Sequence, residues 1–140
     1  MSLQELHKQT SVFIADDDTD DVYLVKSALG QLVEDVNIKH FLNGRELLRG
    51  LIEEHELPSF VLLDLNMPIL DGKETLRQIR RNNQLRNLPV IILSTCRQKE
   101  EQEICLSYGA THYFIKPCQF ATYLEIFRQL KSELIDRMTV

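Results

Sequence analysis

No stretch of this sequence approaches the roughly 18 apolar residues that mark a membrane-crossing helix. The first ten residues, "MSLQELHKQT", also lack the apolar core of a signal peptide. These absences predict a cytoplasmic protein with no membrane partner. Residues 1–10 are expected to form a flexible tail.

Cysteine is scarce and is not arranged for chemistry. The three cysteines, Cys96, Cys105 and Cys118, form no C-x-x-C pair, and their number is odd. This pattern favours reduced, partly buried thiols over a metal site or disulfide. Lys and Arg are not clustered, and the net charge is −5. Because these residues supply most nonspecific affinity for phosphate backbones, no nucleic-acid partner is expected.

What the sequence does contain is a repeated alternation of strand and helix patterns. Five short apolar runs lie at 12–15, 36–41, 60–63, 90–93 and 112–115. The segments between them have helical spacing, as in Val22, Val25 and Leu29. Such alternation predicts an α/β fold, a doubly wound parallel sheet of five strands with five helices. The chain of 140 residues fits one domain, over 11–140, with no linker and no room for an output domain.

The character of each run predicts its place in the sheet. The runs at 12–15, 60–63 and 90–93 are continuously apolar and should be central, whereas "VNIKHF" at 36–41 alternates like an edge strand. Asp71 and Glu74 have the spacing of a helix capping box, and Gly109 is placed to end the fourth helix.

Polar residues follow four of these strands at the edge where parallel sheets bind ligands. They are Asp16, Asp17 and Asp18, then Asp64, then Ser94 and Thr95, and last Lys116 and Pro117. Crowded carboxylates repel unless a cation neutralises them, and Mg²⁺ prefers oxygen ligands. A metal, an ammonium and a hydroxyl together can neutralise a phosphoryl group in transfer, and a carboxylate beside them can be its nucleophile.

Each residue taken singly has a simpler interpretation. Asp18 and Asp21 could cap and charge the N-terminus of the first helix. An acid such as Asp64 after a strand is commonly a turn residue, and Lys116 alone could be a solvated strand end. The joint occurrence of these residues, in order and at strand ends, favours a site.

The motifs "FIADDD", "VLLDLNMPILDG", "PVIILST" and "GATHYFIKP" resemble those of response-regulator receiver domains of two-component signalling, over residues 11–135. The resemblance implies a flavodoxin-like sheet of strand order 2-1-3-4-5. It implies that Asp64 is the phosphoacceptor, that Asp17 binds Mg²⁺ directly and Asp16 through water, and that the backbone carbonyl of Asn66 is a further ligand.

The resemblance also implies a switch beside the phosphoacceptor. Lys116 would pair with phosphoryl oxygens, Ser94 would move toward them, and Tyr113 would be the aromatic coupled to Ser94. Lys116-Pro117 would be a cis peptide. The alternatives, an ordinary strand aromatic at Tyr113 and an ordinary turn at Pro117, stay open.

Thr95 and Cys96 depart from the commonest receiver pattern, since residue 95 is often alanine or glycine in the family. Both flank the expected phosphoryl pocket. "GREL" and "RNNQLRNLPVIILST" further resemble stand-alone receivers linked with phytochrome-type histidine kinases.

Three functions are compatible with these features. The first is a phosphoacceptor switch that takes its phosphoryl group from a sensor histidine kinase or a histidine phosphotransfer protein. It would act on a downstream protein, or on a second copy of the chain, through the fourth helix, fifth strand and fifth helix, and it would not be an enzyme. The second is a phosphatase of haloacid-dehalogenase type, disfavoured because Asn66 stands where such enzymes use an acid. The third is a degenerate receiver that serves as a scaffold, disfavoured because Asp17, Asp64 and Lys116 are all present.

Overall fold

The computed structural model describes residues 9–136. Its strands are β1 (Ser11–Ala15), β2 (Asn37–Phe41), β3 (Phe60–Leu63), β4 (Val90–Ser94) and β5 (His112–Ile115). Its helices are α2 (Thr19–Leu32), α3 (Gly44–Glu53), α4 (Gly72–Arg81), α5 (Lys99–Ser107) and α6 (Phe120–Leu130), which a π-helical turn over Lys131–Ile135 prolongs. The part of the expected tail at residues 1–8 lies outside the described residues.

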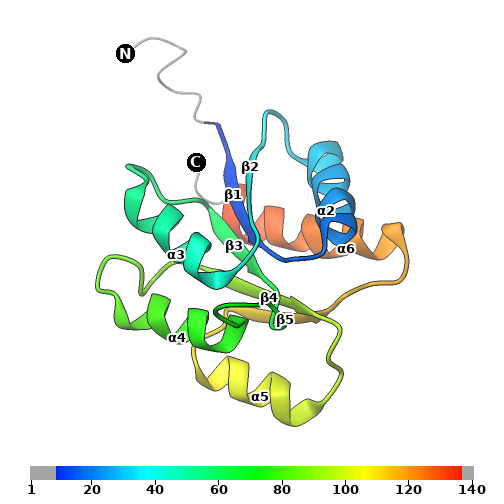
Figure 1. Ribbon diagram of the computed structural model, residues 1–140. Coiled ribbons are helices and arrows are strands. Elements are labelled where there is room, and N and C mark those ends of the chain that lie inside the picture. Colours follow the sequence, from blue (N-terminus) through cyan, green and yellow to red (C-terminus); the bar gives the residue numbers. More distant parts are fainter. Residues whose placement is uncertain (1–8, 137–140) are drawn as a thin grey trace.

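All five strands are parallel, in the order β2-β1-β3-β4-β5 (Figure 1). Strands β1, β3 and β4 lie inside the sheet and are buried nearly throughout, whereas β2 and β5 form its edges and are only partly buried. Both the predicted strand order and the placement of the central strands are therefore confirmed. Continuous apolar runs occupy the centre because both of their faces are covered by helices.

Two hydrophobic cores lie on opposite faces of the sheet. On one face, α2 and α6 cover alternate residues of the central strands, such as Val12, Ile14 and Leu62. On the other face, α3, α4 and α5 cover the residues between them, such as Phe13 and Val61. Figure 1 shows the two helices and the three helices on their respective sides of the sheet. This layering leaves the carboxyl edge of the sheet to the connecting loops.

The ends of the helices are set by the local signals that the sequence carries. Asp18 caps α2, and its side chain accepts from the N–H groups of Asp20 and Asp21. Asp71 caps α4 in the same way through the N–H of Glu74. Gly109 follows α5 with φ 102°, a conformation that favours glycine. Three predicted helix boundaries are thus confirmed.

The three cysteines are free. Cys105 is buried and Cys96 is half-buried, as expected, but Cys118 is exposed because it lies in the turn between β5 and α6. Among residues 9–136, no helix is both long and apolar enough to cross a membrane.

The loop between β3 and α4 contains a strained turn at an exposed isoleucine. Ile69 has φ 70°, and the N–H of Leu70 donates to the carbonyl of Pro68 across it at 2.7 Å. This i-to-i+2 hydrogen bond forms a γ-turn with a left-handed central residue. A β-branched residue is disfavoured there, and the side chain of Ile69 is 67% exposed, so little burial offsets the strain.

We therefore predict that Ile69→Gly raises the free energy of unfolding. Relief of the left-handed strain contributes about 1–2 kcal/mol, and the extra chain entropy of glycine removes about 0.5–1 kcal/mol of this. A matched control is Ile52→Gly, because Ile52 is equally exposed at 69% but lies in α3. The control should lose roughly 0.5 kcal/mol through lower helix propensity. Urea denaturation of both variants measures the difference, and equal destabilisation of the two would contradict the strain at Ile69.

Candidate functional site

The loop after β1 presents three consecutive acids in three different environments. Asp16 is buried, with 5% of its surface exposed, and its Oδ1 accepts from the N–H of Asp18 at 2.9 Å. Asp17 is exposed. Asp18 is committed to capping α2, as the simpler interpretation proposed. The loop therefore places one buried carboxylate, that of Asp16, and one exposed carboxylate, that of Asp17, at the edge of the sheet.

Asp64 follows β3 and meets these acids because β1 and β3 are neighbours. The N–H of Asp64 donates to the carbonyl of Ala15 at 2.9 Å, which continues the ladder by one residue. Gly72 lets α4 begin close by, since a Cβ there would lie 2.2 Å from the carbonyl oxygen of Asp64. Carboxylate oxygens of Asp16, Asp17 and Asp64 lie within 4.8 Å of one another, a grouping that can hold a metal ion.

Lys116 brings a buried ammonium group to these carboxylates from the end of β5. Its side chain is 8% exposed, and its Nζ lies 3.0 Å from Asp16 Oδ2 and 3.6 Å from Asp64 Oδ2. A third carboxylate, that of Asp21, is 2.7 Å away. Burial by itself would lower the pKa of Lys116, but its hydrogen bonds to Asp21 and Asp16 and the charge of Asp64 outweigh burial and raise that pKa. Lys116 is therefore a permanent cation.

Two opposing effects set the pKa values of the buried acids Asp16 and Asp64: burial raises them, and the positive charge of Lys116 lowers them. Burial raises the pKa of Asp64 to about 6, although the charge of Lys116 and the N–H groups of Asn66 and Leu65 oppose the rise. Burial also raises the pKa of Asp16, opposed by the N–H of Asp18 and by Lys116. Near neutral pH, Asp64 is thus an ionised carboxylate that is only weakly stabilised, as suits a nucleophile.

The predicted switch residues form a second group, beside the carboxylates. Ser94 is fully buried at the end of β4, and its Oγ accepts from the N–H of Cys96 at 3.2 Å. The hydroxyl of Tyr113 donates to the carbonyl of Cys96 at 2.8 Å. The side chains of Tyr113 and Ser94 therefore both hydrogen-bond to the backbone of Cys96. Thr95, which lies between Ser94 and Cys96, is exposed, as is Asn66 beyond Asp64.

The cis peptide expected at Lys116-Pro117 is wrong, because the described chain contains no cis peptide bond. The trans form is favoured by about 0.5–1 kcal/mol even before proline. Lys116 reaches the site with the trans peptide, held by its N–H, which donates to the carbonyl of Ser94 at 2.8 Å.

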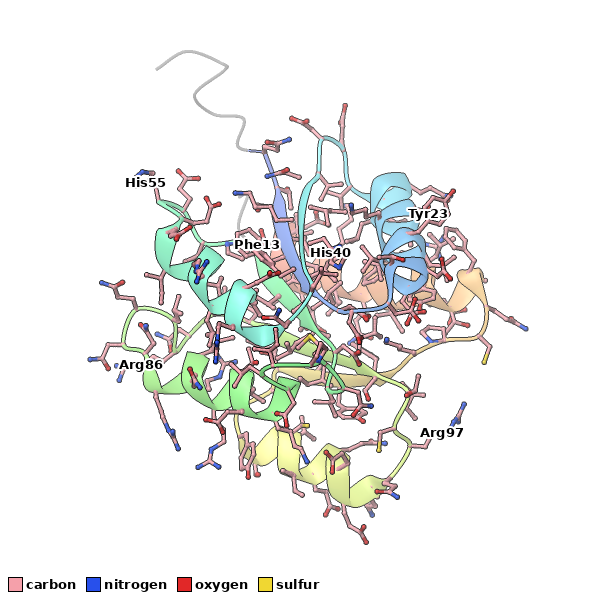
Figure 2. All side chains as sticks on the ribbon, viewed as in Figure 1. Phe13, Tyr23, His40, His55, Arg86 and Arg97 are labelled. Atoms are coloured by element: carbon pink, nitrogen blue, oxygen red, sulfur yellow. The ribbon has the colours of Figure 1, made fainter. Side chains whose placement is uncertain are left out.

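Two site residues were missed by the sequence interpretation. Asp21 was assigned only to capping and charging the helix N-terminus, yet it makes the shortest of the three ion pairs that Lys116 forms within residues 9–136. His40, labelled at the end of β2 in Figure 2, lies with its Nε2 2.7 Å from the carbonyl oxygen of Asp16. A carbonyl can only accept, so the ring donates and holds the acidic loop. No local pattern indicates either contact.

Comparison with known proteins identifies the family of this arrangement. The model of the response regulator receiver domain family matches residues 12–128. The FilR2 protein of Methanothrix harundinacea, described as a probable methanogenesis regulatory protein, is 30% identical over 126 residues, which cover 86% of this chain and 81% of that protein. Several other curated relatives are longer, and the chain spans a quarter to half of their length.

Solved structures agree in fold. The response regulator RPA3017, described as acting in red light signalling of R. palustris, is 27% identical and superposes with a TM-score of 0.82 over 91% of this chain and 94% of that one. The receiver domain of the sensor histidine kinase PA1611 from Pseudomonas aeruginosa, solved with a magnesium ion coordinated in its active-site cleft, is 23% identical with a TM-score of 0.75 over 91% of this chain and 98% of that one.

The raised pKa of Asp64 predicts that this carboxyl destabilises the protein at neutral pH. Between about pH 4 and pH 6, the folded protein binds more protons at Asp64 than the unfolded chain, so its contribution to stability falls as the pH rises. Asp64→Asn should therefore raise the free energy of unfolding at pH 7 by about 1–3 kcal/mol, and the gain should fall toward zero near pH 4. Urea denaturation in EDTA at both values measures the gain. A gain that is equal at both pH values would contradict the raised pKa.

Proposed function

Because the chain belongs to the response-regulator receiver family, we propose that it is a phosphoacceptor switch in which Asp64 receives the phosphoryl group. The observation that carries the proposal is the grouping of Asp64 with two further carboxylates and one buried ammonium group. Receiver domains work with histidine kinases or phosphotransfer proteins, and they are generally signalling domains without catalysis on other substrates. The donor proposed here is accordingly the phosphohistidine of a sensor histidine kinase or of a histidine phosphotransfer protein.

The transfer itself is a displacement at phosphorus. A lone pair of the Asp64 carboxylate forms the new oxygen–phosphorus bond while the nitrogen–phosphorus bond of the phosphohistidine breaks. The bonding electrons leave with the imidazole, which takes a proton from solvent. Lys116 lies 3.6 Å from Asp64 and can neutralise phosphoryl oxygens during the transfer, because such transfers depend on positioning and charge stabilisation.

The donor set fits a hard divalent cation. We assign Mg²⁺ to Asp16, Asp17 and Asp64, with the backbone carbonyl of Asn66 as a further ligand, because Mg²⁺ favours carboxylate and carbonyl oxygens and keeps several waters. The magnesium described in the PA1611 receiver structure supports this choice. When bound, the ion would neutralise charge on the carboxylates and on the incoming phosphoryl group.

The signal would leave the site through the segment after β4. The phosphoryl group on Asp64 would carry about −1.5 to −2 charge in place of the single charge of the carboxylate, with strong acceptor oxygens that can draw the Ser94 hydroxyl and its loop toward Asp64. Tyr113 holds the carbonyl of Cys96 in the same loop, so a shift of Ser94 would be transmitted to β5. Thr95, between them, would border the phosphoryl pocket.

The face formed by α5, β5 and α6 is the proposed surface for a downstream protein or for a second copy of the chain. The helix α5 carries two exposed apolar side chains, Ile104 at 37% and Leu106 at 50%, on either side of the buried Cys105, so one of the two can contribute to this face. Both belong to the helix that follows the Ser94 loop, so a change at the phosphoryl group would reach this face directly.

The proposal predicts Mg²⁺-dependent labelling of Asp64 by a small phosphodonor. Acetyl phosphate should raise the intact mass by one phosphoryl group, and EDTA should prevent the rise. Asp64→Asn should abolish labelling because an amide cannot displace the donor, whereas Asp71→Asn, at an exposed helix cap, should leave it intact. Continued labelling of Asp64→Asn at another residue would refute Asp64 as the acceptor.

The environment of Thr95 predicts a long-lived phosphorylated state. Water must approach the Asp64–phosphorus bond past residues 66, 95 and 96, where Asn66 cannot act as a base and Cys96 offers only weak hydrogen bonding. The β-branched side chain of Thr95 is stiff and crowds the approach more than alanine would.

Thr95→Ala should therefore shorten the lifetime of the phosphorylated protein, with each tenfold change in rate equal to about 1.4 kcal/mol of barrier. Decay of the label after removal of the donor, at fixed Mg²⁺, measures this effect. Thr122→Ala, at an exposed position on α6, is the control. Equal decay in all three proteins would show that Thr95 does not restrict water.

A further inference from the structure

The ammonium group of Lys116 is closer to Asp21 than to the proposed phosphoacceptor. Its Nζ donates to Asp21 Oδ2 at 2.7 Å, whereas Asp64 Oδ2 lies 3.6 Å away, beyond a normal hydrogen bond. The Lys116 side chain is 8% exposed and that of Asp21 is 24% exposed, so solvent screens this ion pair only in part.

Asp21 does not belong to the group of acids that can hold a metal. Among residues 9–136, that group consists of Asp16, Asp17 and Asp64. Asp21 instead lies in the first turn of α2, where the helix dipole favours an anion and fixes its position. The ion pair joins residues 95 positions apart in the sequence, and so connects the start of α2 to the end of β5.

We propose that Asp21 is a positioning residue that holds the Lys116 ammonium away from Asp64 in the unphosphorylated protein and competes with the phosphoryl group for it. The inference rests on the proposed phosphorylation of Asp64. A lysine ammonium has three donors on a flexible stem, so it can exchange one acceptor for another with little change in the backbone. On phosphorylation, Lys116 gives up Asp21 and donates to a phosphoryl oxygen.

This competition sets how strongly the phosphorylated state is favoured. The interaction free energy that Lys116 loses on leaving Asp21 reduces the net free energy that it gains at the phosphoryl group. Only this net difference shifts the equilibrium toward the phosphorylated form. Asparagine at position 21 can still accept a hydrogen bond but carries no charge. It should hold Lys116 less firmly and favour the phosphorylated form.

The test compares Asp21→Asn with Asp20→Asn. Both changes remove one negative charge from the first turn of α2, but the Asp20 side chain makes no hydrogen bond or ion pair with the residues described, and it is exposed. The probe is beryllofluoride, a phosphoryl mimic, at saturating Mg²⁺. Asp21→Asn should bind it about fivefold more tightly than Asp20→Asn, the order expected for a partly screened charged hydrogen bond.

Two further measurements separate positioning from a general structural effect. The Mg²⁺ affinities of the two variants should be equal, because neither residue belongs to the metal group. In the parent protein bound to beryllofluoride, a crystal structure should show Lys116 Nζ within hydrogen-bond distance of a fluorine and no longer bonded to Asp21. That observation tests the exchange even if Asp21→Asn does not fold.

Equal or weaker beryllofluoride binding by Asp21→Asn, or an intact Lys116–Asp21 contact in the complex, would overturn the inference. Failure of the proposed function gives a different result. If the parent protein neither binds beryllofluoride nor takes label at Asp64, the phosphoacceptor role itself is refuted. If the parent is labelled while the two variants behave alike, only the role of Asp21 is refuted.

Discussion

The buried ammonium of Lys116 and the carboxylates around it impose the constraint on which the rest of this structure depends. Asp16 and Asp64 are removed from water by the ends of the central strands, which raises the pKa of both groups. Like charges so close together are tolerated only because Lys116 lies among them at 3.0 Å and 3.6 Å. The loops at this edge are accordingly arranged to keep the cation and the acids in place.

Several tertiary contacts serve that arrangement. The N–H of Asp64 donates to Ala15, and the N–H of Lys116 donates to Ser94, so each charged residue continues the ladder of its strand. His40 holds the carbonyl of Asp16 from the neighbouring edge strand. Asp21 holds Lys116 itself from α2. The Asp64 charge, which the raised pKa predicts to be destabilising at neutral pH, is also the charge that the proposed phosphoryl transfer requires, so stability and the proposed function are expected to oppose each other at this residue.

Much of the fold could be predicted because its signals are local or periodic. The unbroken apolar runs of β1, β3 and β4 identified the central strands, and alternation identified β2 as an edge. The helix ends are set by residues that lie within four positions of the end concerned, namely Asp18, Asp71 and Gly109. The expectation of a cis Lys116-Pro117 peptide came from family resemblance and was wrong. The cis and trans forms of an X-Pro bond differ little in free energy, so contacts of the surrounding loop determine which form is present.

The sequence by itself determined the order of elements, the acids at the ends of β1 and β3, and Lys116 at the end of β5. These follow from hydrophobic periodicity and from the rule that parallel strands present their carboxyl ends at one edge. Only the tertiary structure decided the partners of these charges, with Asp21 rather than Asp64 nearest to Lys116 and with His40 on the carbonyl of Asp16. Such pairings join residues 95 and 24 positions apart. They depend on strand order, strand twist and side-chain rotamers, which packing of the whole domain fixes and no local pattern encodes.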